Sequence, residues 1–262
     1  MTQIMYGHGS VLPDNPISNR PGRTFGGVAI GILLFGTAGY PLPPGSVENA
    51  TTFNYPVHFK PVPEAITEVV VQPQSNETLL HALIREAQEL ENAGCRAIIG
   101  GCGYFGNYLP EVRAAVNIPV FMSSLMQLPF MLNSIAPDKK VLVMCADATA
   151  LPGSQALLHS GVTDESRLVI RGGKTEAVPE MDPVLNNVGA YNPAQLEREL
   201  VSLAKKSVEE DPSIGAVLME CTLYPTHSYA VAEAVHLPVW DFVTMIDWVE
   251  SAVVKKPFKG YI

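Results

Sequence analysis

The stretch "AIIGGCGYFGNYLPEVRAAVNIPVFMSSLMQL" (residues 97–128) decides the fold, because its pattern returns without a gap as "AVLMECTLYPTHSYAVAEAVHLPVWDFVTMID" (216–247). Each copy has a short apolar strand, a cysteine, a helical pattern and a second strand that begins at a proline. The identical pairs are Ala97/Ala216, Cys102/Cys221, Val112/Val231, Ala115/Ala234, Val116/Val235, Pro119/Pro238, Val120/Val239 and Met126/Met245. Two βαβ units of similar composition match at some positions by chance, but chance less readily superposes two cysteines at the same strand end.

A weaker repeat lies earlier in each half, where "ILLFGTAGYPL" (32–42) aligns with "VLVMCADATAL" (141–151). Short apolar strands alternate with helical patterns along the rest of the chain, which indicates parallel sheets covered on both faces. Strands are expected at 26–36, 66–72, 95–100, 118–122, 139–145, 214–219 and 237–242. Helices are expected after Asn76, after Asn192-Pro193 and over 243–255.

These patterns predict an α/β protein with two pseudo-symmetric, doubly wound halves whose parallel sheets face a shared cleft. Residues 1–24 are polar and aperiodic, and we interpret them as an N-terminal arm. The first half is expected to comprise 25–135 plus 243–262, and the second half 136–242. The proline-rich stretch of about 37–64 reads as one long loop of the kind that forms lids or binding loops.

Composition excludes several classes of function. The chain has 262 residues and a net charge of −9, which disfavours a nucleic-acid partner. Its four cysteines include no CxxC pair, so neither a disulfide scaffold nor a structural zinc site is expected. We expect free thiols in a reducing cytoplasm, with no metal and no cofactor.

The apolar run "GGVAIGILLFG" (26–36) is too short to span a bilayer, and no membrane association is expected. Because it follows Arg20 and Arg23, the core of a signal peptide is an alternative interpretation. No small-residue cleavage site follows directly, and "YPLPPG" comes next, so we interpret the run as a buried strand.

The two repeat-equivalent cysteines are the candidate catalytic residues. Ligands of open parallel sheets bind beyond the carboxyl ends of the strands, which would place Cys102 and Cys221 on opposite walls of one cleft. A helix N-terminus lowers the pKa of a cysteine, and we expect this at both positions. One thiolate could then remove a proton from carbon while the opposite thiol returns one on the other face. The alternative is that each cysteine only packs in the core.

Other candidate substrate-binding residues follow the strands or the two cysteines. No arginine lies within ten residues of either cysteine, so a substrate carboxylate would be held mainly by backbone N–H groups and hydroxyls. Tyrosines could form a pocket wall that attracts an apolar or sulfonium group. The candidates are Thr37, Tyr40, Gly103, Tyr104, Ser123, Ser124, Asp147, Thr149, Thr222, Leu223 and Tyr224.

The motifs "GGCGYF" (100–105) and "MECTLYPTH" (219–227) resemble those of the aspartate/glutamate (Asp/Glu/hydantoin) racemase superfamily over about residues 26–255. This group includes cofactor-independent amino-acid racemases, hydantoin racemase, arylmalonate decarboxylase and maleate isomerase. Cys221-Thr222 matches the second family motif. The first motif, usually Cys-Asn-Thr, is Cys102-Gly103-Tyr104 here, and Leu223 replaces the histidine of glutamate racemases. Gly36 and Thr37 stand where the family has an acidic residue. These differences argue against aspartate or glutamate as the substrate.

Within this superfamily, the sequence resembles most a branch that is similar to the algal dimethylsulfoniopropionate lyases in three features. The shared features are Pro43-Pro44-Gly45 after the first strand, Cys102-Gly103-Tyr104, and Glu220-Cys221-Thr222. The resemblance implies that a cysteine abstracts the proton next to a carboxylate and that dimethyl sulfide leaves from the β carbon.

The first hypothesis is therefore a racemase or epimerase acting on a small carboxylate-bearing substrate, with Cys102 and Cys221 as the two acid/base groups. A lyase of the same superfamily is the second hypothesis, and a non-catalytic, two-lobed small-molecule-binding protein is the third. We also expect a homo-oligomer.

Overall fold

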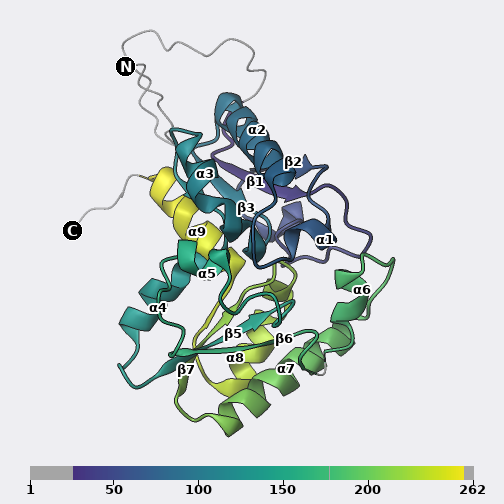
Figure 1. Ribbon diagram of the computed structural model, residues 1–262, viewed down its shortest axis with the longest axis vertical. Coiled ribbons are helices and arrows are strands. Elements are labelled where there is room, and N and C mark those ends of the chain that lie inside the picture. Colours follow the sequence, from purple (N-terminus) through teal and green to yellow (C-terminus); the bar gives the residue numbers. More distant parts are fainter. Residues whose placement is uncertain (1–25, 177, 257–262) are drawn as a thin grey trace, which may run out of the picture.

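Two parallel sheets of four strands each form the framework of the molecule (Figure 1). The computed structural model describes residues 26–176 and 178–256. The first sheet has the order β2 (Val57–Val62), β1 (Ile30–Phe35), β3 (Ala97–Gly100), β4 (Val120–Phe121). The second has the order β6 (Leu168–Gly172), β5 (Lys140–Cys145), β7 (Ile214–Met219), β8 (Val239–Trp240). The two orders are equivalent strand for strand, which confirms the predicted fold class.

Helices and single turns connect the strands. The α-helices are α1 (Thr67–Val70), α2 (Glu77–Ala93), α3 (Leu109–Ala114), α4 (Leu128–Ser134), α5 (Gln155–His159), α6 (Met181–Leu185), α7 (Pro193–Glu210), α8 (Ser228–Val235) and α9 (Phe242–Val253). Four 3-10 helices are η1 (Ala50–Thr52), η2 (Gly103–Tyr108), η3 (Ser124–Gln127) and η4 (Tyr224–His227). Among the described residues, no helix combines the length and the apolar character needed to cross a membrane.

The two long helices begin and pack as their sequences predict. The Asn76 side chain caps α2 by accepting from the Leu79 backbone N–H, and Asn192 caps α7 in the same way. The α2 helix ends at Gly94, whose φ of 107° is the left-handed conformation that glycine adopts without strain. Each helix buries one apolar stripe against its own sheet.

The structure corrects the prediction at three places. Residues 66–72 were expected to form a strand because of their β-branched run, but 67–70 form the short helix α1. The place beside β1 is taken by β2, which lies within the expected loop of 37–64 and carries Pro61. Proline is tolerated there because β2 is an edge strand. The sequence analysis also missed β6, the corresponding edge strand of the second sheet.

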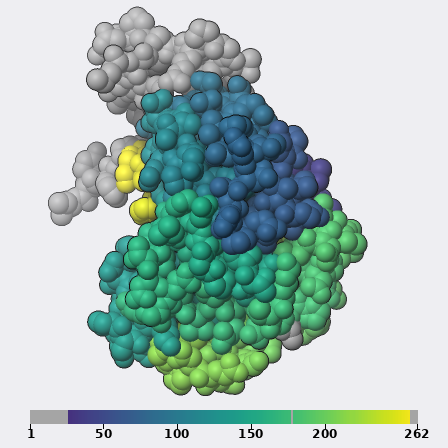
Figure 2. All heavy atoms as spheres, viewed as in Figure 1, coloured from purple at the N-terminus to yellow at the C-terminus, as the bar shows by residue number. Residues whose placement is uncertain are grey.

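The helix that follows each sheet's last strand packs against the other sheet. Leu128 and Met131 of α4, which follows β4, lie in one buried cluster with Val141 and Val143 of β5. The α9 helix follows β8, yet Phe242 and Ile246 lie in one cluster with β1 and β3. The space-filling view shows the blue atoms of the first half in direct contact with the green atoms of the second (Figure 2). The N-terminal arm predicted for 1–24 lies outside the described residues.

We expect Phe242→Ala to destabilise the protein by about 3–5 kcal/mol, because it empties the site where α9 contacts the first sheet. Phe242 is fully buried, whereas Tyr229 on α8 is 78% exposed. The control Tyr229→Ala should change the free energy of unfolding by less than about 0.5 kcal/mol in chemical denaturation. Equal effects of the two substitutions would contradict the described packing of α9.

Candidate active site

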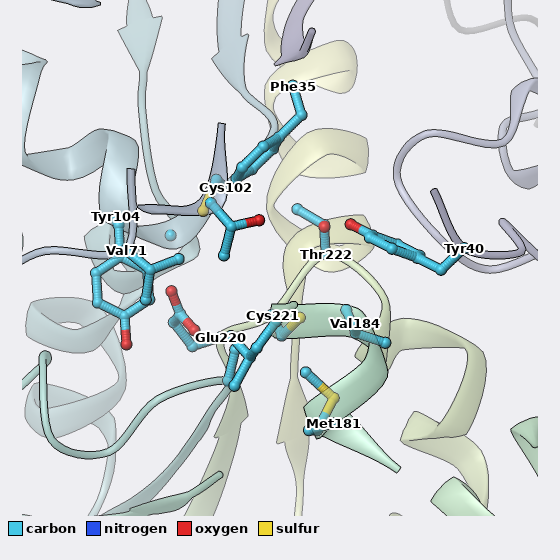
Figure 3. A pocket seen from close by; sticks show the side chains of 14 residues that line it. Phe35, Tyr40, Val71, Cys102, Tyr104, Met181, Val184, Glu220, Cys221 and Thr222 are labelled. Atoms are coloured by element: carbon cyan, nitrogen blue, oxygen red, sulfur yellow. The ribbon is translucent and has the colours of Figure 1, made fainter. Parts of the chain in front are cut away.

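A cavity lies at the carboxyl ends of the strands, where the two halves meet (Figure 3). Its empty volume is about 420 Å³, which includes space that is open to solvent. Both repeat-equivalent cysteines contribute to its wall. The lining residues are Phe35, Tyr40, Thr67, Val71, Cys102, Gly103, Tyr104, Ala146, Met181, Val184, Leu185, Glu220, Cys221 and Thr222.

Cys102 enters the cavity from the first half. It directly precedes η2, in extended backbone conformation, after the central strand β3. Burial and the neighbouring Glu220 carboxyl group raise the pKa of the Cys102 thiol well above its ordinary value. A hydrogen bond from the backbone N–H of Tyr104 acts in the opposite direction and favours the thiolate.

Cys221 enters from the second half, after the equivalent strand β7. Burial and Glu220 also raise the pKa of this thiol, and Glu48 adds to the shift. Hydrogen bonds from the backbone N–H groups of Leu223 and Tyr224 favour its thiolate. Figure 3 shows the two cysteine side chains in one cavity, reaching it from different strand ends.

The prediction that both cysteines have lowered pKa values is therefore wrong. The expected backbone N–H groups are present at both sulfurs, but the turns after Cys102 and Cys221 lead into short 3-10 helices, η2 and η4. The stabilisation of a thiolate by these N–H groups is smaller than the combined penalty of burial and nearby acids. The raised pKa values favour the protonated thiols at neutral pH.

Glu220 is a site residue that the sequence analysis quoted in a motif but gave no role. Its side chain is in the cavity wall, the residue is only 1% exposed, and burial raises the pKa of the carboxyl group to about 8. The backbone N–H of Ala146 favours the ionised form, whereas the Asp147 carboxylate disfavours it. Among the described residues, neither carboxyl oxygen has a partner in hydrogen-bonding geometry. The signal in the sequence was a charged residue directly at the end of an apolar strand.

Glu48 is a second acid that the sequence analysis did not single out. It comes from the loop after β1, whose Val47 backbone N–H donates to the Thr222 carbonyl at 3.1 Å. The Thr222 hydroxyl donates to Glu48 Oε1 at 2.7 Å. Burial raises the pKa of Glu48, although this hydrogen bond lowers it. Because the Thr222 proton is committed to Glu48, this hydroxyl is not a free donor for a substrate carboxylate.

Three other predicted residues line the cavity with the cysteines: Tyr40, Gly103 and Tyr104. The Tyr104 hydroxyl donates to the Asp147 carbonyl at 2.6 Å, which fixes its ring in the wall. Tyr40 points its hydroxyl toward the cavity in Figure 3. Burial and nearby acids raise the pKa of Tyr40, so its hydroxyl remains a proton donor at neutral pH.

The remaining predicted residues lie outside the cavity lining. Leu223 and Tyr224 are buried behind Cys221, with the Tyr224 hydroxyl bonded to the Cys145 carbonyl at 3.2 Å. Ser123 caps η3, while the Ser124 hydroxyl donates to the Glu220 carbonyl at 3.2 Å.

The loops after β1 and β5 hold the last three candidates away from the cavity wall. Asp147 accepts from Thr149 and forms an ion pair with Lys174. Thr149 and Thr37 are exposed. The part of the chain that the structure describes contains no group of three or more His, Cys, Asp or Glu side chains placed to hold a metal ion.

The fold and the paired thiols define a class of protein, and comparison with known families identifies it. The model of the Asp/Glu/Hydantoin racemase family matches residues 53–252. The chain belongs to this family, and it is an enzyme of the racemase superfamily.

Curated relatives within this superfamily are 30–32% identical to the chain over the aligned residues. Dimethylsulfoniopropionate lyase 5 of Emiliania huxleyi (strain CCMP1516) is 32% identical over 243 residues, covering 88% of this chain and 47% of the relative. Dimethylsulfoniopropionate lyase 3 of the same strain is 30% identical, covering 84% and 59%. The dimethylsulfoniopropionate lyase of Durusdinium sp. clade D is 30% identical, covering 88% and 77%. The chain thus spans about half to three fifths of the length of the first two relatives.

Solved structures share the fold at low sequence identity. Allantoin racemase from Pseudomonas fluorescens superposes with a TM-score of 0.60 at 15% identity, covering 89% of this chain and 98% of that one. An aspartate racemase homologue from Pyrococcus horikoshii OT3 gives 0.54 at 17% identity, with 86% and 98% covered. Unliganded arylmalonate decarboxylase gives 0.53 at 14% identity, with 89% and 95% covered.

The raised pKa of Glu220 predicts a pH-dependent penalty on stability. The carboxyl group has a pKa of about 8 in the folded protein and an ordinary value of 4.5, so the folded state retains a proton that the unfolded state has lost. Stability therefore falls as pH rises from 4.5 to 8, by up to about 1.4 kcal/mol per pH unit from this group. The substitution Glu220→Gln should remove this dependence and gain stability relative to the wild type as pH rises. Parallel urea-denaturation curves of both proteins at several pH values measure the difference, and a pH-independent difference would contradict the assignment.

Proposed function

We propose that this protein is a cofactor-independent lyase that removes the proton next to a carboxylate and expels a leaving group from the β carbon, with Cys102 and Cys221 as its acid/base groups. The observation that carries the proposal is the presence of two thiols, each with its own backbone N–H donors, in one cavity. The dimethylsulfoniopropionate lyases among the curated relatives support elimination as the outcome, with dimethylsulfoniopropionate as the substrate to test.

The proposed step balances without a further reagent. A cysteine thiolate takes the proton from the carbon next to the carboxylate, and the electron pair of that C–H bond forms the carbon–carbon double bond. The bond from the β carbon to the sulfonium sulfur breaks, and its electrons stay on sulfur. The products are acrylate, neutral dimethyl sulfide and a protonated cysteine, which then releases its proton to solvent.

Two features of the cavity suit this chemistry. The neutral Tyr40 hydroxyl can donate to the substrate carboxylate, where negative charge develops as the proton leaves. Phe35, Val71, Met181 and other apolar lining residues limit water in the cavity, which strengthens each electrostatic interaction there. The substrate in this proposal is a small molecule that carries a carboxylate.

Racemization or epimerization is the second candidate. It is favoured by one observation, the repeat-equivalent placement of the two thiols on the two central strand ends. Proton removal by one thiolate and return by the other thiol would invert the carbon. The two reactions share the first step and differ in whether a leaving group is present.

We expect Cys102→Ala and Cys221→Ala each to lower the turnover of dimethylsulfoniopropionate by at least about 100-fold, the usual contribution of a positioned acid/base group. Dimethyl sulfide is measured by gas chromatography and acrylate by proton NMR. Cys95→Ala is the matched control, because Cys95 is buried in the core and does not line the cavity. Unchanged turnover in both active-site variants would overturn the role of the cysteines.

Incubation of the wild type in heavy water, with dimethylsulfoniopropionate and separately with chiral amino or hydroxy acids, separates the two candidate reactions. Elimination gives acrylate and dimethyl sulfide in equal amounts. A racemase would instead place deuterium on the carbon next to the carboxylate of a chiral amino or hydroxy acid, with inversion and no release of a leaving group. A wild type that does neither would refute both candidates.

A further inference from the structure

The Glu220 carboxyl group poses a physical problem that proton transfer by two cysteines does not explain. A buried carboxyl group with no hydrogen-bond partner carries a large desolvation cost, and native proteins seldom leave such a group unpaired. Glu220 is 1% exposed, and neither of its carboxyl oxygens has a partner in full hydrogen-bonding geometry among the described residues, although the Ala146 backbone N–H favours the ionised form. Its side chain nevertheless belongs to the cavity wall. A ligand in the cavity could supply such a partner.

Gly103 provides the space in which this carboxyl group lies. A Cβ atom added at Gly103 would stand 1.5 Å from Glu220 Oε1 and 2.3 Å from the carboxyl carbon. Any side chain at this position would displace the Glu220 carboxyl group. A glycine is needed here because it has no side chain. At this point Gly103 of the first cysteine motif lies directly against Glu220 of the second.

The ionisable groups around the cavity are all acids. They are Tyr40, Cys102, Tyr104, Glu220 and Cys221, and no lysine, arginine or histidine is among the lining residues. Glu48 adds a further acid behind Thr222. No cationic side chain of the lining offsets the charge of a purely anionic ligand, whereas a positive group would favour ionisation of Glu220 and would be attracted to the resulting carboxylate. The rings of Phe35 and Tyr104 line the same cavity and can attract a cation through their faces.

We propose that the Glu220 carboxyl group is the specificity-determining residue of this site, that it receives a positively charged group of the substrate, and that Gly103 keeps open the space it requires. The proposal rests on the proposed function for the identity of the carboxylate-bearing substrate. It adds that the substrate is a zwitterion whose cationic group, a sulfonium in the case to be tested, lies against Glu220.

A cation in this position has a consequence for both cysteines. Glu220 is a cause of the raised pKa of each thiol, and a bound cation would offset its negative charge. The ion pair would therefore raise the pKa values of the two thiols less than an unpaired Glu220 carboxylate would.

The test compares two ligands of nearly the same shape. Dimethylsulfoniopropionate carries a sulfonium sulfur where 4-methylpentanoate carries a neutral CH group, and the two are otherwise alike. Binding is measured by isothermal titration calorimetry in a Cys102→Ser, Cys221→Ser background, in which the ligand is not consumed. We expect the sulfonium compound to bind at least about tenfold more tightly than its neutral counterpart.

Two variants in that background test the assigned roles. Glu220→Gln keeps the shape and removes the charge, so the affinity ratio should fall to about one. Gly103→Ala keeps the charge and displaces the carboxyl group, and it should reduce the ratio in the same direction. Glu89→Gln is the matched control, because Glu89 is an exposed residue of α2, and the ratio should not change.

The outcomes separate this proposal from the proposed function. If the affinity ratio is unchanged by Glu220→Gln, a negative charge at this position is not needed and the proposed role of Glu220 is overturned. The same result would be seen if the carboxyl group acted only as a neutral hydrogen-bond donor, because the glutamine amide is also a donor. Equal binding of the two ligands by the unsubstituted Glu220 protein also overturns it. If the ratio depends on Glu220 while the wild type releases no dimethyl sulfide, the lyase function fails and the recognition of a cation stands.

Discussion

The site depends on the packing of one helix from each half against the sheet of the other half. Each half lays the helix after its last strand against the sheet of the other half, α4 against β5 and α9 beside β1 and β3. Polar contacts join the same region, since Gln127 Nε2 donates to the Asp241 carbonyl at 2.9 Å. This packing joins the two sets of strand ends between which the cavity lies.

That packing explains how the site can hold several acids at once. Burial raises the pKa values of Cys102, Cys221 and Glu220, and the acids raise one another further. The raised pKa values favour the neutral forms of these groups, and a compensating positive charge would favour their ionisation. Backbone N–H groups from the turns after the two cysteines supply the only stabilisation of the thiolates that the main chain offers in the described structure. The energy needed to keep this arrangement folded comes from the shared apolar cores.

The sequence was sufficient to predict the parts of the molecule that repeat. The internal repeat predicted that both thiols lie at equivalent strand ends. When the two copies are aligned so that their apolar strands match, the residues directly after those strands, Cys102 and Cys221, match as well. The sequence was insufficient for 66–72, where β-branched residues favour a strand but β2 already pairs with β1. It also assigned Thr222 to substrate binding, since nothing local shows that Glu48, far away in the sequence, takes its proton. Glu220 was missed for a related reason: its environment comes from Gly103, on the other half.

The two halves are equivalent in backbone but not in charge, and this difference gives the cavity a direction. In the repeat, Glu220 corresponds to Gly101, and Gly103 corresponds to Thr222. A Cβ atom at Gly101 would stand 2.6 Å from the Leu33 carbonyl oxygen, so main-chain packing prevents a carboxylate there. The acid can be accommodated on one side alone. In the proposed mechanism, a zwitterion with its cationic group against Glu220 would direct its carboxylate away from this residue, toward the Tyr40 hydroxyl. The carbon between them would then meet the two thiols in one orientation, and the acid on one side would determine which face of that carbon each thiol meets.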